Sequence, residues 1–348
     1  MNRFKAHSIF FVALLLLMSC GLIFEHKFKT YTTSFPEIPL PLSEFNTIYD
    51  DYNSALHEVG DFFPLLFSTN RGSEGRQYDF IVKFLGINFQ YTRNILTIGE
   101  GNSATSETLY RLVNTVNNDA DQLGPCIIPG AYNQKEHYQS YIFLYSSNEE
   151  GSQDIRFTHN LTTKDYNPTK TVAFLNSTAD DAYPIITQDS SSLYFCSNRS
   201  GNFDIYSVAL NTNKGIIAEL ESSVPKPIVK ETTFSSDGDD KCPYILGNFM
   251  VFTSNRPGGF GGFDLYYSIY KNGTWSAPVN FGDKINSPAD EYRPIVRFMN
   301  EFDSNILLND FMIFSSNRAG GKGGFDLYYV GISQIRDNFL SQEALGFK

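Results

Sequence analysis

Short apolar runs alternate with polar, glycine-containing turns along most of the chain, at the spacing typical of β-strands. The clearest case is the stretch 254–267, which reads SNRPGGFGGFDLYY, and the stretch 316–329 repeats it as SNRAGGKGGFDLYY. Continuous apolar runs such as FMIFSS at 311–316 precede the turns and predict buried strands. Each unit therefore predicts a hairpin in which glycine supplies the positive φ angles that a tight turn demands.

This hairpin motif occurs five times, at an average spacing of about 62 residues. Each copy has an Asn after a Ser or Thr, usually followed by an Arg, and an Asp ahead of the next apolar run; Glu149 replaces the Arg in the second copy. Groups that recur in every unit indicate scaffold. We expect each Asp to accept hydrogen bonds from its own turn or to pair with the Arg of its copy. The recurring residues are Asn70, Arg71, Asp79, Asn148, Asp154, Asn198, Arg199, Asp204, Asn255, Arg256, Asp264, Asn317, Arg318 and Asp326.

A second motif recurs in phase with the first and is acidic. It has an apolar residue, an Asn or Ser, a Ser or Thr, and then two acidic residues, usually followed by Pro; the second copy keeps one acid. In units arranged around an axis, these carboxylates would gather at one channel mouth and bind a basic partner segment or a hard cation such as Ca²⁺. The alternative is that each pair caps its local turn. These candidate partner-binding residues are Asp50, Asp51, Asp121, Asp180, Asp181, Asp239, Asp240, Asp290 and Glu291.

Four antiparallel strands fit into each unit, which is typical of a β-propeller blade. The last unit stops after its third strand, near Ile332, whereas the chain begins with an isolated fourth strand, IPLPLSEFNT at 38–47. Pairing of these two ends would leave no exposed sheet edge. The sequence therefore predicts an all-β fold: a single closed propeller over residues 38–332, with five four-stranded blades and the N-terminal strand completing the last blade. Six blades is the alternative. The helical spacing within 105–116 predicts one short helix.

The units resemble the WD-like β-propeller repeat of the TolB type, in the variant found in bacterial envelope proteins. The matching stretches lie at 254–294 and 316–329, and the likeness weakens in the first two units. The resemblance implies a propeller that docks partner proteins on one face or in its channel.

The N-terminal segment 1–19 has the features of a secretory signal peptide, with two cations and then an apolar core of about 11 residues. The sequence LMSCG at 17–21 resembles a bacterial lipobox, in which Cys20 becomes lipidated. The alternative is an uncleaved anchor, because the apolar run continues to Phe24. We therefore expect a lipoprotein of the outer membrane that faces the periplasm, with the cell surface as the alternative. Residues 20–37 would form a tether and residues 333–348 a C-terminal tail.

The formal net charge of −11 argues against nucleic acid as a partner, because phosphate backbones demand basic patches. The glycine turns are not phosphate loops, since a strand follows them and GK[ST] is missing. No nucleophile elbow, HExxH motif or His–Cys zinc spacing occurs. Cys126, Cys196 and Cys242 lie in apolar runs and are expected to be small buried side chains. These features predict no catalytic residue, no metal and no cofactor, apart from the Ca²⁺ that the acidic mouth would accept.

The functional prediction is a non-enzymatic, membrane-anchored scaffold for protein–protein interactions, or an accessory subunit of an outer-membrane assembly. Its partners would be envelope or outer-membrane proteins. A glycan-binding envelope lipoprotein is the alternative, because the chain has 21 Tyr and 31 Phe and its loops are rich in carboxylates. Hydrolysis of a glycan or a peptide is the least favoured interpretation. A non-repeating aromatic cluster on one face would favour the glycan.

Overall fold

The computed structural model describes residues 33–56, 63–90, 92–101, 106–297 and 308–333. The predicted signal peptide, the lipidation site Cys20, most of the tether and all but the first residue of the tail lie outside these ranges and stay predictions.

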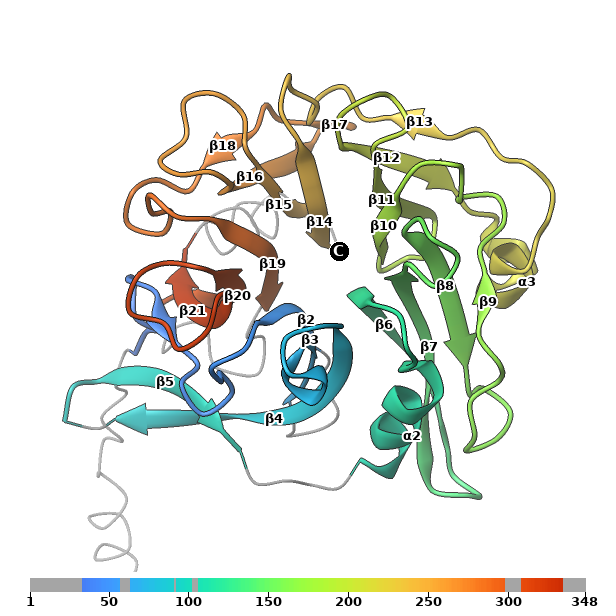
Figure 1. Ribbon diagram of the computed structural model, residues 1–348, viewed down its shortest axis with the longest axis horizontal. Coiled ribbons are helices and arrows are strands. Elements are labelled where there is room, and N and C mark those ends of the chain that lie inside the picture. The colour runs from blue at the N-terminus through green and yellow to red at the C-terminus, as the bar shows by residue number, and fades with distance from the viewer. Residues whose placement is uncertain (1–32, 57–62, 91, 102–105, 298–307, 334–348) are drawn as a thin grey trace, which may run out of the picture.

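Five antiparallel sheets surround a common axis (Figure 1). The prediction of a closed, all-β propeller with five blades is therefore confirmed, and the six-bladed alternative is excluded. The blades, from the axis outward, are as follows: blade one, β2 (Asp51–Leu56), β3 (Phe63–Thr69), β4 (Asp79–Gln90) and β5 (Ile95–Glu100); blade two, β6 (Gln122–Asn133), β7 (Tyr138–Ser147), β8 (Asp154–His159) and β9 (Lys170–Thr171); blade three, β10 (Asp181–Ile186), β11 (Ser192–Ser197), β12 (Asp204–Ala209) and β13 (Val229–Lys230); blade four, β14 (Asp240–Leu246), β15 (Phe249–Ser254), β16 (Asp264–Lys271), β17 (Thr274–Trp275) and β18 (Val279–Asn280); blade five, β19 (Glu291–Arg297), β20 (Asp310–Ser316), β21 (Asp326–Ile332) and β1 (Leu40–Pro41).

The N-terminal strand closes the ring, as the sequence predicts. Leu40 of β1 pairs with Tyr329 of β21, and the Leu42 N–H donates to the Leu327 carbonyl at 2.8 Å. The Asn46 side chain makes two hydrogen bonds to the Leu327 backbone: it accepts from the N–H at 2.8 Å and donates to the carbonyl at 3.0 Å. Asn117, Asn176 and Asn286 make the same pair of bonds in blades one, two and four, whereas blade three has Ser235 at this position. In these four blades the Asn of the acidic motif therefore ties the segment that precedes the acidic pair to the third strand.

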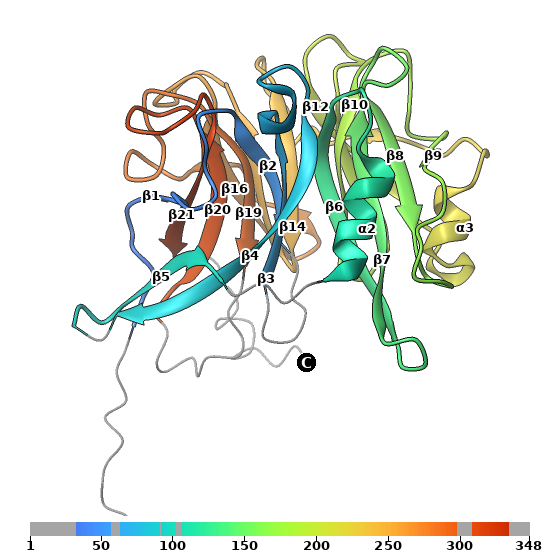
Figure 2. The same ribbon diagram turned by 60° about the horizontal axis from the view of Figure 1, so that its bottom comes forward.

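Helix α2 (Glu107–Val116) packs between blades one and two (Figure 2). Ser106 caps it by accepting a hydrogen bond from the Leu109 N–H. Leu109, Leu112 and Val116 are buried against Phe80 and other aromatic side chains of β4 and β7. The helix predicted within 105–116 is therefore confirmed. The other helical segments among the described residues are short: α3 (Ile216–Leu220), η1 (Arg71–Ser73) and η2 (Thr212–Lys214).

Each innermost strand carries a β-bulge at the same position. The bulge is marked by a shift in the strand register and by one residue with φ between 50° and 60°. Pro follows that residue in four of the five blades, where a bulge tolerates the missing N–H. The bulge turns side chains toward the axis, which fills the centre of the disc. The five residues at this position are Asn53, Gly124, Tyr183, Cys242 and Arg293.

Candidate functional site

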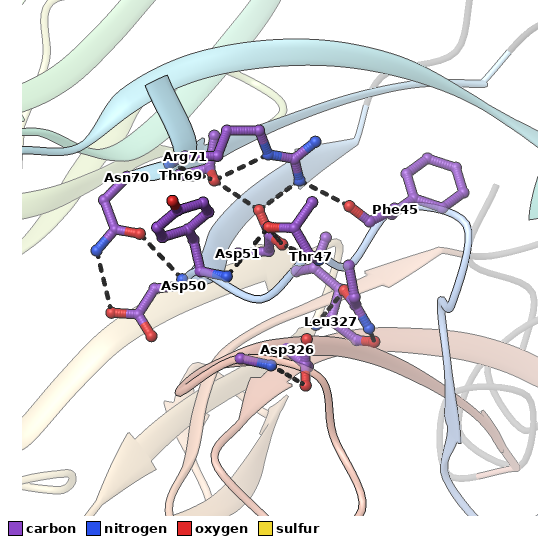
Figure 3. Close-up of polar contacts among 12 residues, drawn as sticks. Phe45, Thr47, Asp50, Asp51, Thr69, Asn70, Arg71, Asp326 and Leu327 are labelled. Atoms are coloured by element: carbon purple, nitrogen blue, oxygen red, sulfur yellow. Dashed lines mark hydrogen bonds and ion pairs between the residues drawn. The ribbon is translucent and has the colours of Figure 1, made fainter. Parts of the chain in front are cut away.

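The second residue of each acidic pair lies in a buried ion pair (Figure 3). Asp51 is 0% exposed, and its Oδ2 accepts from the Thr47 N–H at 2.6 Å and the Thr47 hydroxyl at 2.9 Å. Its Oδ1 accepts from Thr69 at 2.6 Å and from Arg71 at 2.5 Å. Arg71 also donates to the Phe45 carbonyl at 2.7 Å. This network joins the loop that precedes β2 to the turn between β3 and β4.

The same ion pair recurs in three other blades, with N···O distances of 2.5 to 2.8 Å: Asp181–Arg199, Asp240–Arg256 and Glu291–Arg318. Blade two has Gln122 at the acidic position and Glu149 at the Arg position, so the anion and the cation are missing together. The expectation that Arg pairs with the Asp of its own copy is therefore wrong. Its partner lies about 20 residues earlier in the chain, in the acidic pair.

In three of the five copies, those with Asp204, Asp264 and Asp326, the Asp accepts hydrogen bonds from its own turn, which is the other option that the sequence left open. Asp264 accepts from the N–H groups of Phe260 at 2.7 Å and Gly261 at 3.1 Å. Asp326 accepts from those of Lys322 at 2.5 Å and Gly323 at 3.2 Å. In blade three the Ser200 hydroxyl of the turn donates a hydrogen bond to Asp204, and Lys230 forms an ion pair with the same carboxylate. Burial raises the pKa of Asp79, Asp154 and Asp326.

The first residue of each acidic pair joins neighbouring blades. The Asp50 N–H donates to Asn70 at 3.0 Å, Asn70 donates back to the carboxylate, and Asp50 Oδ1 accepts from the Phe325 N–H of blade five at 2.8 Å. Asp121, Asp180, Asp239 and Asp290 accept in the same way from a backbone N–H of the preceding blade. Turn capping, the alternative that the sequence left open, thus accounts for contacts of every pair. Four of the nine candidate carboxylates are fully buried, so a partner at this mouth would meet only the five half-buried ones.

A cation at this acidic mouth stays a prediction. Within the described ranges, no group of three or more His, Cys, Asp or Glu side chains is arranged to hold a metal ion. The mouth is instead ringed by half-buried aromatic side chains. Tyr52 stacks on Phe325 at 5.6 Å between ring centroids and meets Tyr78 edge-on at 4.9 Å, and the Tyr78 hydroxyl donates to Asp50 at 2.6 Å.

A hollow lies at the opposite end of the inner strands, about 20 Å from the acidic pairs for strands of six residues. This axial cavity has a volume of about 650 Å³. Its walls come from all five blades, including Leu56, Cys126, Ile186, Tyr244 and Arg297. The walls are mainly apolar, which is typical of a small-molecule site.

A second hollow of about 550 Å³, the aromatic cleft, opens beside the axial cavity between blades three and four. The two share Thr187, Gln188 and Ile245 as lining residues, so they adjoin. Trp275 packs edge-on against Tyr270 at 5.2 Å between centroids, and Tyr194 lines the same cleft. Tyr270 is 42% exposed. Trp275 is the single Trp of the chain and has no counterpart in the other repeats, so the cleft is a non-repeating aromatic cluster.

Polar side chains of the β10–β11 hairpin face the aromatic residues across this cleft. They belong to Thr187, Gln188, Asp189, Ser191 and Ser192. Asp189 Oδ1 accepts from the Ser191 N–H at 3.0 Å and from the hydroxyls of Thr187 at 2.7 Å and Ser191 at 2.8 Å. These bonds, the Ser191 N–H first, lower the pKa of Asp189. The cleft therefore presents a fixed, ionised acceptor at neutral pH. Sequence reasoning missed it, because neither Trp275 nor Asp189 recurs.

Arg293 is buried in the core near the axis and is 1% exposed. Its guanidinium donates to the carbonyls of Pro125 at 2.9 Å and Pro243 at 3.4 Å. The three thiols predicted to be buried are buried, and burial raises the pKa of Cys242 to about 12.

No family model and no curated protein matches this sequence. Solved structures do match its fold. An endo-arabinase from Bacteroides thetaiotaomicron VPI-5482 shares 12% identity over 85% of this chain and 97% of its own, with a TM-score of 0.49. A glycoside hydrolase shares 7% identity over 90% of this chain and 94% of its own, with a TM-score of 0.50. A protein described as an RGII complex shares 6% identity over 85% of this chain and 91% of its own, with a TM-score of 0.50.

These structures correct three expectations drawn from the sequence. The matching structure with a TM-score of 0.50 that is described as a glycoside hydrolase is not a TolB-type protein, so the TolB family assignment is wrong. The expectations of a non-enzymatic protein-docking scaffold and of no enzymatic activity are corrected by the same finding. Identities of 6 to 12% establish the shared fold alone. Among the described residues, no helix is long and apolar enough to cross a membrane.

Proposed function

We propose that the protein recognises glycan chains and holds them in the aromatic cleft between blades three and four. The observation that carries the proposal is the cleft itself, which is lined by Trp275, Tyr270 and Tyr194 together with polar residues of 187–192. Aromatic rings offer large apolar faces on which the C–H face of a sugar can stack. A few fixed polar groups then select the hydroxyl pattern.

The fold supports this choice of ligand. Five-bladed propellers of this shape occur in glycoside hydrolases, and one of the matching structures is described as an RGII complex. The Asp189 carboxylate, oriented by three hydrogen bonds, is suited to accept bonds from sugar hydroxyls. If Cys20 is lipidated as the sequence predicts, the cleft would work at the outer membrane, on the periplasmic side that the sequence favours.

Binding is tested by calorimetric titration of the full-length chain with arabino-, xylo- and galacto-oligosaccharides. We expect Trp275→Leu and Tyr270→Leu to weaken the binding of the best ligand at least about tenfold, or about 1.4 kcal/mol. The control is Tyr132→Leu, since Tyr132 is 47% exposed but lies on the β6–β7 hairpin away from the cleft. Binding that survives Trp275→Leu, or that Tyr132→Leu weakens equally, would reject the cleft as the site.

Cleavage of the bound chain is a second candidate, favoured by the fixed carboxylate in the cleft. Glycoside hydrolysis uses a pair of carboxyl groups, and Asp189 supplies one. The same titration mixtures can be assayed for new reducing ends. Reducing ends that form with the wild type and disappear with Asp189→Asn would assign Asp189 to the reaction. Loss of affinity without any cleavage in the wild type would assign it to hydroxyl binding.

A further inference from the structure

Arg293 is a buried cation that no anion compensates. It is 1% exposed, its guanidinium donates to two backbone carbonyls, and its Nε has no hydrogen-bond partner. Its guanidinium also lies 5.8 Å from the centre of the Tyr183 ring. Within the described part of the chain it forms no ion pair. Burying a charge without an opposite charge is costly. The protein has a net charge of −11, so acidic partners are plentiful in the sequence, yet none among the described residues pairs with Arg293.

The Arg293 guanidinium lies next to the axial cavity, behind the backbone of Pro125, and is not itself part of the cavity wall. Pro125, whose carbonyl it contacts at 2.9 Å, lines that cavity. So do Cys126 and Tyr244, and the charge of Arg293 lowers the pKa of both groups against the larger effect of burial, which raises it. The positive charge of Arg293 therefore acts on the cavity across the wall residues that separate them, such as Pro125. In this apolar, partly enclosed space it is screened less than at the surface.

The cavity adjoins the aromatic cleft. Thr187, Gln188 and Ile245 line both hollows. A chain of sugars whose first ring stacks on Trp275 would therefore place its next unit toward the axis. Among the described residues, the walls of the axial cavity contain no carboxylate and one cationic side chain, Arg297, so no negative charge there repels an anion.

We infer that the axial cavity selects an acidic sugar, one that bears a carboxylate, as the unit that follows the ring in the aromatic cleft. This inference rests on the proposed function, because the cleft must first hold the chain. Arg293 acts here as a specificity-determining residue that favours the anionic form of the ligand. The bulge in β19 places it at the axis, and its carbonyl partners in blades two and four fix the guanidinium there.

The test compares two ligands that differ only in charge: an oligogalacturonate trimer and its methyl ester. Both are titrated into the full-length wild type, into Arg293→Gln, which can still donate to a carbonyl, and into Arg293→Lys, which keeps the charge. We expect the wild type and Arg293→Lys to prefer the acid by about tenfold, and Arg293→Gln, in which Arg297 still lines the cavity, to lose most of that preference. Affinity for a neutral xylo-oligosaccharide of the same length should be similar in all three proteins.

Salt gives a second measurement, which requires no variant. The preference of the wild type for the acid should shrink as NaCl rises from about 0.05 to about 0.5 M, because ions screen the charge. Equal affinity of the wild type for acid and ester overturns the inference and leaves the cleft intact. An unchanged preference in a folded Arg293→Gln protein also overturns it. Failure of every glycan, neutral or acidic, to bind the wild type rejects the proposed function instead.

Discussion

Removal of Arg256 isolates the contribution of the ion pair that recurs in four blades. Asp240 is 0% exposed, and its Oδ1 accepts from Arg256 at 2.6 Å, while its Oδ2 accepts from the N–H and hydroxyl of Ser236. Arg256→Met therefore deprives a buried carboxylate oxygen of its cationic donor. Breaking a buried ion pair costs about 3 to 5 kcal/mol. The Arg256 side chain is 16% exposed, which admits some water, so we expect a loss of about 3 kcal/mol.

Blade two shows how the cost can be avoided. It has Gln122 and Glu149 where the other blades have an acid and an Arg, and its sheet forms with the same order of strands. The double variant Asp240→Asn with Arg256→Met removes the buried charge together with its partner. We expect it to recover about 2 kcal/mol of the loss, because removing both members of a buried pair is far less costly than removing one.

Urea unfolding of the full-length chain, followed by the emission of Trp275, measures these differences by linear extrapolation. The control is Arg76→Met, because Arg76 is exposed in a glycine turn and its side chain donates to a backbone carbonyl, that of Ser73. We expect a change within about 0.5 kcal/mol for this control. A loss of unfolding free energy below about 1 kcal/mol for Arg256→Met would refute the assignment of a buried ion pair. A double variant that is no more stable than Arg256→Met would refute it as well.

Three further predictions follow from contacts elsewhere in the ring. Asn46→Ala removes two bonds to Leu327 at the closure of the ring and should lower the free energy of unfolding by about 2 kcal/mol in urea; no loss would show that closure does not depend on this side chain. Burial raises the pKa of the Asp154 carboxyl in the folded state, so the folded protein binds the carboxyl proton more firmly than the unfolded chain does. The stability of the protein therefore falls as the pH rises from about 4 through the raised pKa. Asp154→Asn should make this fall in stability smaller in thermal melts, and an unchanged dependence of stability on pH would contradict the prediction. Cys242 is buried with a raised pKa, so mass spectrometry should find its peptide unmodified after iodoacetamide at pH 8 and modified once urea is added; rapid labelling without urea would contradict its burial.

Periodicity alone was enough to predict the architecture. The five copies of the hairpin motif predict five blades, and the mismatched ends of the repeat predict that the N-terminal strand completes the last blade, which the pairing of Leu40 with Tyr329 confirms. These predictions succeed because a blade must bury its strands against its neighbours, which imposes the same pattern on each unit. The likeness to TolB-type repeats rested on that same hairpin, so it reported the fold of a blade and not the family.

Residue pairings and the site were harder to predict. Arg71 and Asp79 are near each other in the sequence, yet Arg71 binds Asp51, which the fold brings over it from a different loop. The acidic pairs drew attention because they recur, and recurrence marks residues that hold blades together. The cleft is built from single residues such as Trp275 and Asp189, and the axial cavity from the ends of five strands. No local sequence pattern predicts the cleft or the axial cavity.

The most direct test of glycan recognition is the fluorescence of Trp275, because this residue is the single Trp and lies in the cleft. The full-length chain is titrated with the oligosaccharide that binds best in calorimetry. We expect a saturable change in emission at the same Kd, lost in Tyr270→Leu and retained in Tyr132→Leu. Calorimetric binding with no change in Trp275 emission would contradict the account, because the glycan would then lie elsewhere on the propeller.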